Sequence, residues 1–135
     1  MGNSIKDIYV DDYQAVVGDL LTRNRSILDI TSKFISSASK VNRSVLKAVT
    51  HCGCITVDAK KQNFPDEVNY ENMLGLMDTH LKGKLCENCR RNFENEVGDT
   101  LFYIAALCNI LDISMYDVIL KDKEALSTLG SYSLR

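Results

Sequence analysis

Two short cysteine pairs constrain the fold of this chain more than any other feature of its sequence. Cys52-Gly53-Cys54 supplies one pair, Cys86-Glu87-Asn88-Cys89 supplies the other, and 31 residues lie between them. Four thiolates are the number that a tetrahedral structural zinc ion binds, and short spacing lets one turn of backbone present two sulfurs to one ion. The sequence therefore predicts a structural zinc site whose ligands are Cys52, Cys54, Cys86 and Cys89.

Other readings of the thiols remain open. His51 stands beside the first pair and could replace one thiolate, and the second pair could be a redox motif. A thioredoxin-type motif would need a βαβ setting, which the sequence does not show. Free cysteines can also behave as small apolar residues, and Cys108 in an apolar run is expected to do so. The polar segment 1–12 does not resemble a secretory signal, so we expect reduced thiols and a cytoplasmic protein.

Helical periodicity dominates the rest of the chain, which has one proline and no tryptophan. A short extended segment is predicted at 54–57, a break at 112–114 and a polar, weakly ordered tail at about 127–135. We predict one all-α domain over residues 1–135, a bundle of four to five helices with a zinc-clipped irregular loop of about a dozen residues. The expected helices are 7–22, 25–50 with Ser26 as its cap, 66–81, 86–111 and 115–126.

The helix predicted at 86–111 is apolar around most of its circumference from Leu101 to Leu107. A monomeric bundle of this size cannot cover such a helix on all sides, so we expect a homodimer or homotetramer. The longest apolar stretch, 101–108, is far too short to span a bilayer, and no membrane partner is expected.

Charge is unevenly distributed along the chain. The formal net charge is −2, yet residues 22–63 hold eight basic and only two acidic side chains. A net acidic chain argues against a dedicated nucleic-acid-binding protein. Within the basic segment, Lys40, Arg43 and Lys47 could bind a phosphate or the acidic surface of a neighbouring subunit, although a solvated helix face is the simpler explanation.

Two carboxylates enter the apolar part of the 86–111 helix. Glu96 and Asp99 are three residues apart and therefore leave the same face of a helix. The sequence Glu96-Val97-Gly98-Asp99-Thr100-Leu101-Phe102-Tyr103-Ile104-Ala105-Ala106-Leu107, followed by Asn109-Ile110-Leu111-Asp112-Ile113, resembles a segment of MazG-like nucleoside triphosphate pyrophosphohydrolases. The segment is the third helix and following turn of that family, and the similarity covers residues 92–124.

The resemblance implies an all-α fold that assembles as dimers or tetramers, binds magnesium and hydrolyses a nucleoside triphosphate to monophosphate and pyrophosphate. Glu96 and Asp99 match the family's metal ligands. The family's second acidic pair, Glu-x-x-Glu on the preceding helix, has no counterpart, since Glu67 and Glu71 share a face without fitting the motif. Two functions therefore stay open: a metal-dependent nucleotide hydrolase, or a catalytically inactive zinc-stabilised module that binds a nucleotide or protein partner.

Overall fold

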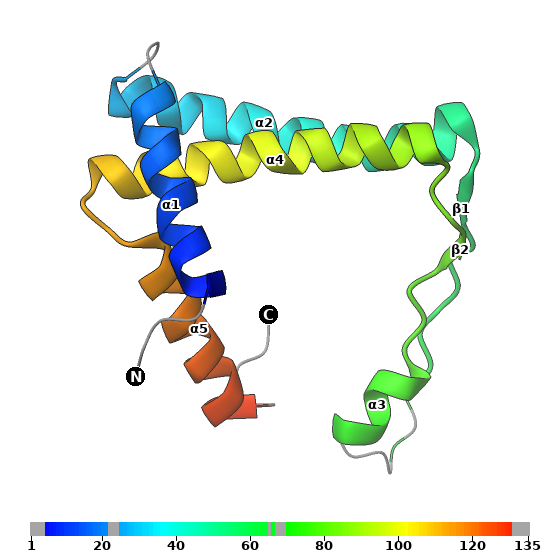
Figure 1. The fold of residues 1–135 in the computed structure, drawn as a ribbon. Coiled ribbons are helices and arrows are strands. Elements are labelled where there is room, and N and C mark those ends of the chain that lie inside the picture. The colour runs from blue at the N-terminus through cyan, green and yellow to red at the C-terminus, as the bar shows by residue number, and fades with distance from the viewer. Residues whose placement is uncertain (1–4, 22–24, 65, 67–69, 131–135) are drawn as a thin grey trace. The chain divides into compact units, whose positions relative to one another are not determined.

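The computed structural model describes residues 5–21, 25–64, 66 and 70–130, and most of these are helical (Figure 1). The predicted predominance of helix is therefore confirmed, but an all-α description is incomplete because two short strands also form. The elements in chain order are α1 (Ile5–Leu20), α2 (Ile27–Lys47), the π-helical turn η1 (Ala48–Cys52), β1 (Ile55–Val57), α3 (Tyr70–Leu76), β2 (Leu81–Gly83), α4 (Glu87–Ile110) and α5 (Met115–Leu129).

Four of the five predicted helices correspond to observed ones. The Oγ atom of Ser26 accepts a hydrogen bond from the N–H of Leu28 at 3.3 Å, as expected for the residue that caps α2. At the other end, η1 extends α2 as far as Cys52. The predicted break at 112–114 separates α4 from α5. Residues 127–129, which were expected in a weakly ordered tail, continue α5, and 131–135 lie outside the described residues.

The helix predicted at 66–81 is wrong at its carboxyl end. Residues 67–69 lie outside the described part of the chain, α3 ends at Leu76, and 81–83 form β2. Asp78 explains the change, because its Oδ1 accepts a hydrogen bond from the N–H of His80 at 2.9 Å. Such a local side-chain bond competes with helical backbone bonding. His80 itself adopts a left-handed backbone conformation with φ of 60°, which no helix continues through.

The chain divides into two compact units, residues 1–41 with 95–135, and residues 42–94. The boundaries fall within α2 and α4, so each of these helices contributes to both units. The first unit contains α1, α5 and most of α4, and it carries the predicted carboxylates. The second contains the hairpin of β1 and β2 and all four paired cysteines. A single domain over residues 1–135 stays a prediction.

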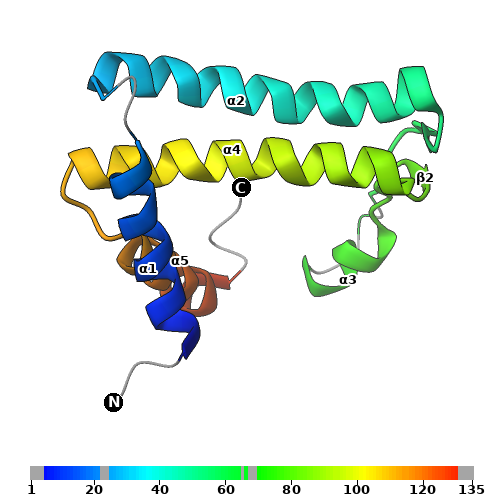
Figure 2. The same ribbon diagram turned by 45° about the horizontal axis from the view of Figure 1, so that its top comes forward.

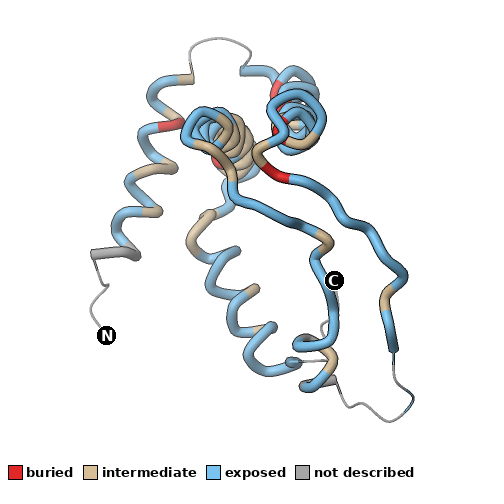
Figure 3. The backbone as a smooth tube through the Cα atoms, turned by 90° about the vertical axis from the view of Figure 1, so that its right-hand side faces the viewer, coloured by how far each residue is buried: buried red, intermediate tan, exposed pale blue. Residues whose placement is uncertain are grey.

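The core of the first unit is small. Its buried side chains come from three helices and are Val17, Ile30, Ala105 and Ala106. The two alanines allow other helices to approach α4 closely, and half-buried aromatic rings complete the cluster. Phe102 and Tyr103 pack edge to face with ring centroids 5.3 Å apart, an arrangement that aromatic quadrupoles favour. Figure 3 shows how few residues of the chain are buried.

Many large apolar side chains of the first unit remain exposed. Tyr9 is 72 % exposed and Leu20 66 % exposed on α1, and α5 exposes Val118, Ile119, Leu126 and Leu129. Among the described residues no single helix is long and apolar enough to cross a membrane; α4 and α5 pass that test only together, as a pair bent by 105°.

Helix α1 contacts α5 (Figure 2). Gln14 of α1 forms hydrogen bonds with residues at the start of α5. Its Nε2 donates to the carbonyl of Ile113 at 2.7 Å, and its Oε1 accepts from the N–H of Met115 at 2.7 Å. Met115 is the first residue of α5, so Gln14 satisfies a backbone donor that no intrahelical bond can reach. Ser114 caps the same helix through the N–H of Asp117.

Replacing Gln14 should therefore destabilise the first unit. Gln14→Ala removes both bonds and leaves a half-buried N–H without its partner, which should lower the free energy of unfolding by about 1–3 kcal/mol. Gln14→Glu keeps the acceptor for Met115 but cannot donate to Ile113, so its loss should be smaller. Urea denaturation of the three proteins measures these differences, and equal stability of Gln14→Ala and the parent chain would contradict this role.

Candidate metal centre

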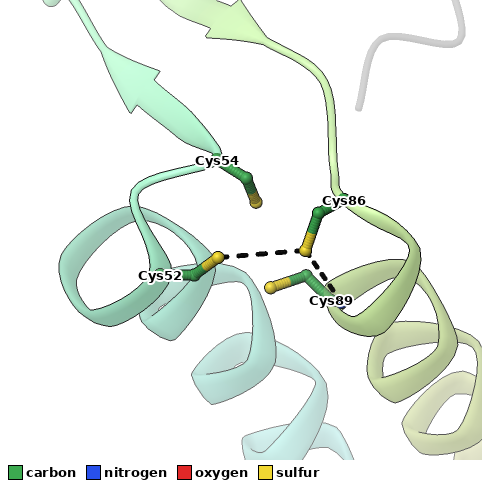
Figure 4. A group of neighbouring side chains, drawn as sticks. All are labelled: Cys52, Cys54, Cys86 and Cys89. Carbon is green, nitrogen blue, oxygen red and sulfur yellow. Dashed lines mark hydrogen bonds between the residues drawn. The ribbon is translucent and has the colours of Figure 1, made fainter.

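The four paired cysteines converge in the second unit, with their side chains directed toward one another (Figure 4). Their sulfur atoms all lie within 4.8 Å of one another, and the Sγ atoms of Cys52 and Cys86 are 3.8 Å apart. A Zn–S distance of about 2.3 Å in a tetrahedron places two sulfurs about 3.8 Å apart, whereas a disulfide needs about 2.05 Å. All five cysteines are free. The four sulfurs could therefore hold one metal ion.

A reversal of the backbone at Gly53 places the first pair. The N–H of Gly53 donates to the carbonyl of Ala48 at 2.9 Å, which closes η1, and Gly53 has a φ of 79°. This left-handed conformation is unfavourable for residues that have a Cβ. The reversal brings Cys54 back toward Cys52, so the glycine between the two thiols is a requirement of the geometry.

The second pair lies at the start of α4. The Sγ of Cys86 accepts a hydrogen bond from the N–H of Cys89 at 3.4 Å, in the manner of a helix cap. This backbone bond lowers the pKa of the Cys86 thiol to about 7. The Cys86 sulfur in turn raises the pKa of Cys89 to about 12. A thiolate at one cysteine therefore opposes ionisation of the neighbouring thiol. A bound cation allows several of the thiols to ionise together.

An antiparallel hairpin brings the two pairs together. Strand β1 begins directly after Cys54, β2 ends three residues before Cys86, and Ile55 pairs with Gly83. Gly83 has a φ of 87°, and a Cβ there would lie 2.7 Å from the carbonyl oxygen of Cys54. A side chain at this position would push the strands apart. The helix predicted at 66–81 gave no indication of this role of Gly83.

Gln62 closes the far end of the hairpin, and its role also was not predicted. Its Nε2 donates to the carbonyl of Asp78 at 2.7 Å, and its Oε1 accepts from the N–H of Asp78 at 3.1 Å. The N–H of Asp58 donates to the carbonyl of His80 at 2.8 Å. The His80 ring is within hydrogen-bonding distance of Gln62, so His80 belongs to the hairpin. His51 is exposed and is not among the four clustered ligands.

Very little apolar packing supports this unit. Among its described residues only Ala48 and Ile55 are buried. So small a core cannot order a chain of this length without a further source of stability, such as a structural metal. The sulfur cluster is the feature of the second unit best suited to supply it.

Glu96 and Asp99 lie on α4 in the first unit. Glu96 is half-buried, and its Oε2 is buried without a hydrogen-bond partner among the described residues. Asp99 is exposed. Burial raises the pKa of Tyr13 on α1, and the charge of Asp99 adds to this effect. In the described part of the chain, only the four cysteines form a group of three or more His, Cys, Asp or Glu side chains close enough to share an ion. Among the described residues, therefore, no third carboxylate or histidine joins Glu96 and Asp99.

The three basic residues proposed for phosphate binding are all exposed on α2. Lys40 belongs to the first unit, and Arg43 and Lys47 belong to the second. Within the residues that the structure describes, none of them forms an ion pair. Cys108 is half-buried in the first-unit part of α4 and is not one of the four clustered cysteines.

Comparison with known proteins finds no matching family model, no matching curated protein and no matching solved structure. Functional inference for this chain therefore starts from its own residues.

Substitution of Gly83 tests the hairpin geometry. Gly83→Ala should destabilise the second unit by roughly 1–3 kcal/mol or more, because the left-handed φ and the contact with Cys54 both oppose a Cβ. Gly98→Ala is the matched control: a Cβ there meets no atom within 4 Å, and alanine in a helix interior should stabilise by about 0.5–1 kcal/mol. Thermal unfolding followed by circular dichroism should shift in opposite directions for the two variants. A shared direction would count against the account of Gly83.

Proposed function

We propose that the four-cysteine centre binds one structural zinc ion per chain. The donor set supports zinc, since four soft thiolates in a closed tetrahedral arrangement are typical of structural zinc sites and leave no position for a substrate. The small core of the second unit supports a structural role. A reducing, cytoplasmic compartment would keep the thiols available for the metal.

Loss of one ligand should weaken both metal binding and folding. Purified protein should contain about one zinc per chain, and Cys86→Ser should lower both zinc content and melting temperature. Cys108→Ser removes a thiol outside the cluster and should leave zinc content unchanged. Mass spectrometry under native conditions reads the stoichiometry directly. A parent protein that is metal-free and equally stable, prepared without chelator, would refute the zinc centre.

We further propose that the protein is a MazG-like nucleotide pyrophosphohydrolase, which hydrolyses a nucleoside triphosphate to monophosphate and pyrophosphate. The observation that carries this proposal is the buried Oε2 of Glu96, which has no hydrogen-bond partner among the described residues. A buried carboxylate oxygen without a partner is unfavourable, and a divalent cation would compensate it. Asp99, one helical turn further on, would be the second ligand.

Each element of such a site has a defined role. Magnesium, when bound, neutralises phosphate charge and polarises a coordinated water. Glu96 and Asp99 bind the cation from one face of α4, and the half-buried position of Glu96 limits competing contacts with solvent. Lys40, which belongs to the same unit, remains a candidate for a phosphate contact.

Assembly would complete this site. Two carboxylates are few for magnesium, and a second copy of the chain could supply the missing oxygen ligands. The exposed apolar side chains of α1 and α5 support a homodimer or homotetramer, since an isolated unit with this surface would associate. We expect the same helices to bury this surface and to bring acidic residues of the second copy close to α4.

A specific observation favours a second function, a catalytically inactive module that binds a nucleotide or protein partner. Helix α2 carries no Glu-x-x-Glu pair, and its buried polar side chain is Ser37, whose hydroxyl donates to the carbonyl of Phe34 at 2.7 Å. A position already satisfied in this way offers no ligand to a cation. In this case Glu96 and Asp99 would be helix-surface acids, and zinc would be the only metal.

Asp99→Asn distinguishes the two functions. The substitution preserves shape and removes a charged ligand, so release of pyrophosphate from nucleoside triphosphates with Mg²⁺ or Mn²⁺ should fall by a large factor, about 100-fold or more. Zinc content should not change, because the two sites share no residue. Asp112→Asn, on the turn that follows α4, is a matched control that should retain activity.

Activity that survives Asp99→Asn would overturn the role given to the carboxylates. If no common or modified triphosphate is hydrolysed and neither Mg²⁺ nor Mn²⁺ raises the melting temperature of the zinc-loaded protein, the inactive module is the correct function. Light scattering on the same samples should report a dimer or larger, and a monomer would remove the second copy from the site.

A further inference from the structure

The hairpin of the second unit has one apolar face that the unit only partly covers. Residues that pair directly across an antiparallel ladder lie on the same side of the sheet. Ile55 and Val57 therefore share a face with Leu81, whereas Thr56 and Lys82 lie on the opposite face. Ile55 is buried, but Val57 is 59 % exposed and Leu81 is 48 % exposed. The apolar face therefore extends past Ile55 to Val57 and Leu81, which the rest of the unit leaves about half exposed.

A groove of about 380 Å³ opens where this face meets α2 and α4. Its apolar wall includes Ile55, Leu81, Leu85 and Phe93, and its two charged lining residues are Lys84 and Arg90. No carboxylate lines it. The volume lies within the range of sites that bind small molecules, about 300–1,000 Å³. All of the lining residues belong to the second unit.

Neither cation of the groove is paired with a carboxylate among the described residues. The neighbouring Arg91 pairs with Glu87 at 3.5 Å, whereas neither Lys84 nor Arg90 forms an ion pair within the described residues. An apolar wall beside two unpaired cations complements a ligand that has an apolar body and an anionic group. A neutral apolar ligand would leave the charges unused, and a purely polar anion would leave the wall exposed to water.

We propose that this groove binds a small single-chain amphiphile that carries a carboxylate or phosphate group. The apolar chain lies along Leu81, Leu85 and Phe93, and the anionic group contacts Lys84 and Arg90. The inference rests on the proposed zinc centre, because Leu85 directly precedes Cys86 and Arg90 directly follows Cys89. The metal ligands therefore hold both sides of the groove in position.

Octanoate, octyl phosphate and 1-octanol, below their aggregation concentrations, are suitable probes because they share one chain and differ in the head group. In ¹⁵N-labelled, zinc-loaded protein, the two anions should shift amide resonances within residues 81–93. They should bind more tightly than 1-octanol. Lys84→Gln and Arg90→Gln should each weaken octanoate binding by about two- to fivefold, the effect of an exposed charge contact. Arg91→Gln, on the same helix but outside the groove, should leave binding unchanged.

Zinc content measured on the same samples separates failure of the groove from failure of the metal centre. Zinc-loaded protein whose 81–93 resonances do not respond to octanoate would overturn the groove while leaving the metal centre intact. Equal affinity for 1-octanol and octanoate, or loss of affinity in Arg91→Gln, would also overturn it. If the chain binds no zinc but octanoate shifts the same amides, the groove stands and the metal centre fails.

Discussion

The convergence of four sulfur atoms joins the two ends of the hairpin in the second unit. Only two of the described side chains of this unit are buried, so apolar packing contributes little to its stability. The sulfurs join the end of η1 to the start of α4, and the hairpin between them is held by three paired residues per strand. With a metal in place, separate weak contacts become one connected unit. The first unit has an apolar cluster of its own, and the hydrogen bonds of Gln14 join α1 to the start of α5.

The sequence was sufficient to predict features whose signals are local. Cysteine spacing identified the four cysteines that cluster, and apolar periodicity located α1, α2, α4 and α5. Ser26 could be recognised as a cap because the capping bond spans only two residues. These predictions succeeded because the physical cause and the sequence pattern occupy the same few residues.

Features that depend on distant partners were missed. Strand β2 has only three residues, and its identity follows from pairing with β1 more than 20 residues away. The hydrogen bonds of Gln62 to Asp78 likewise join residues 16 positions apart in the sequence. Glu96 is a further example at the candidate magnesium site, because its Oε2 is buried without a hydrogen-bond partner among the described residues. A Glu-x-x-Asp spacing predicts a shared face, but the burial of one oxygen depends on neighbouring helices.

The proposed zinc and magnesium sites would do different work in different units. Soft thiolates in the second unit organise structure, whereas hard carboxylates on α4 in the first unit would act on phosphate. Cobalt substitution tests the central claim most directly, because four-thiolate Co²⁺ absorbs strongly in the visible range only when tetrahedral. The account predicts saturation at one Co²⁺ per chain, displacement by Zn²⁺ and protection of four of the five thiols from alkylation. An absence of the tetrahedral spectrum, with all five thiols equally reactive in zinc-treated protein, would contradict it.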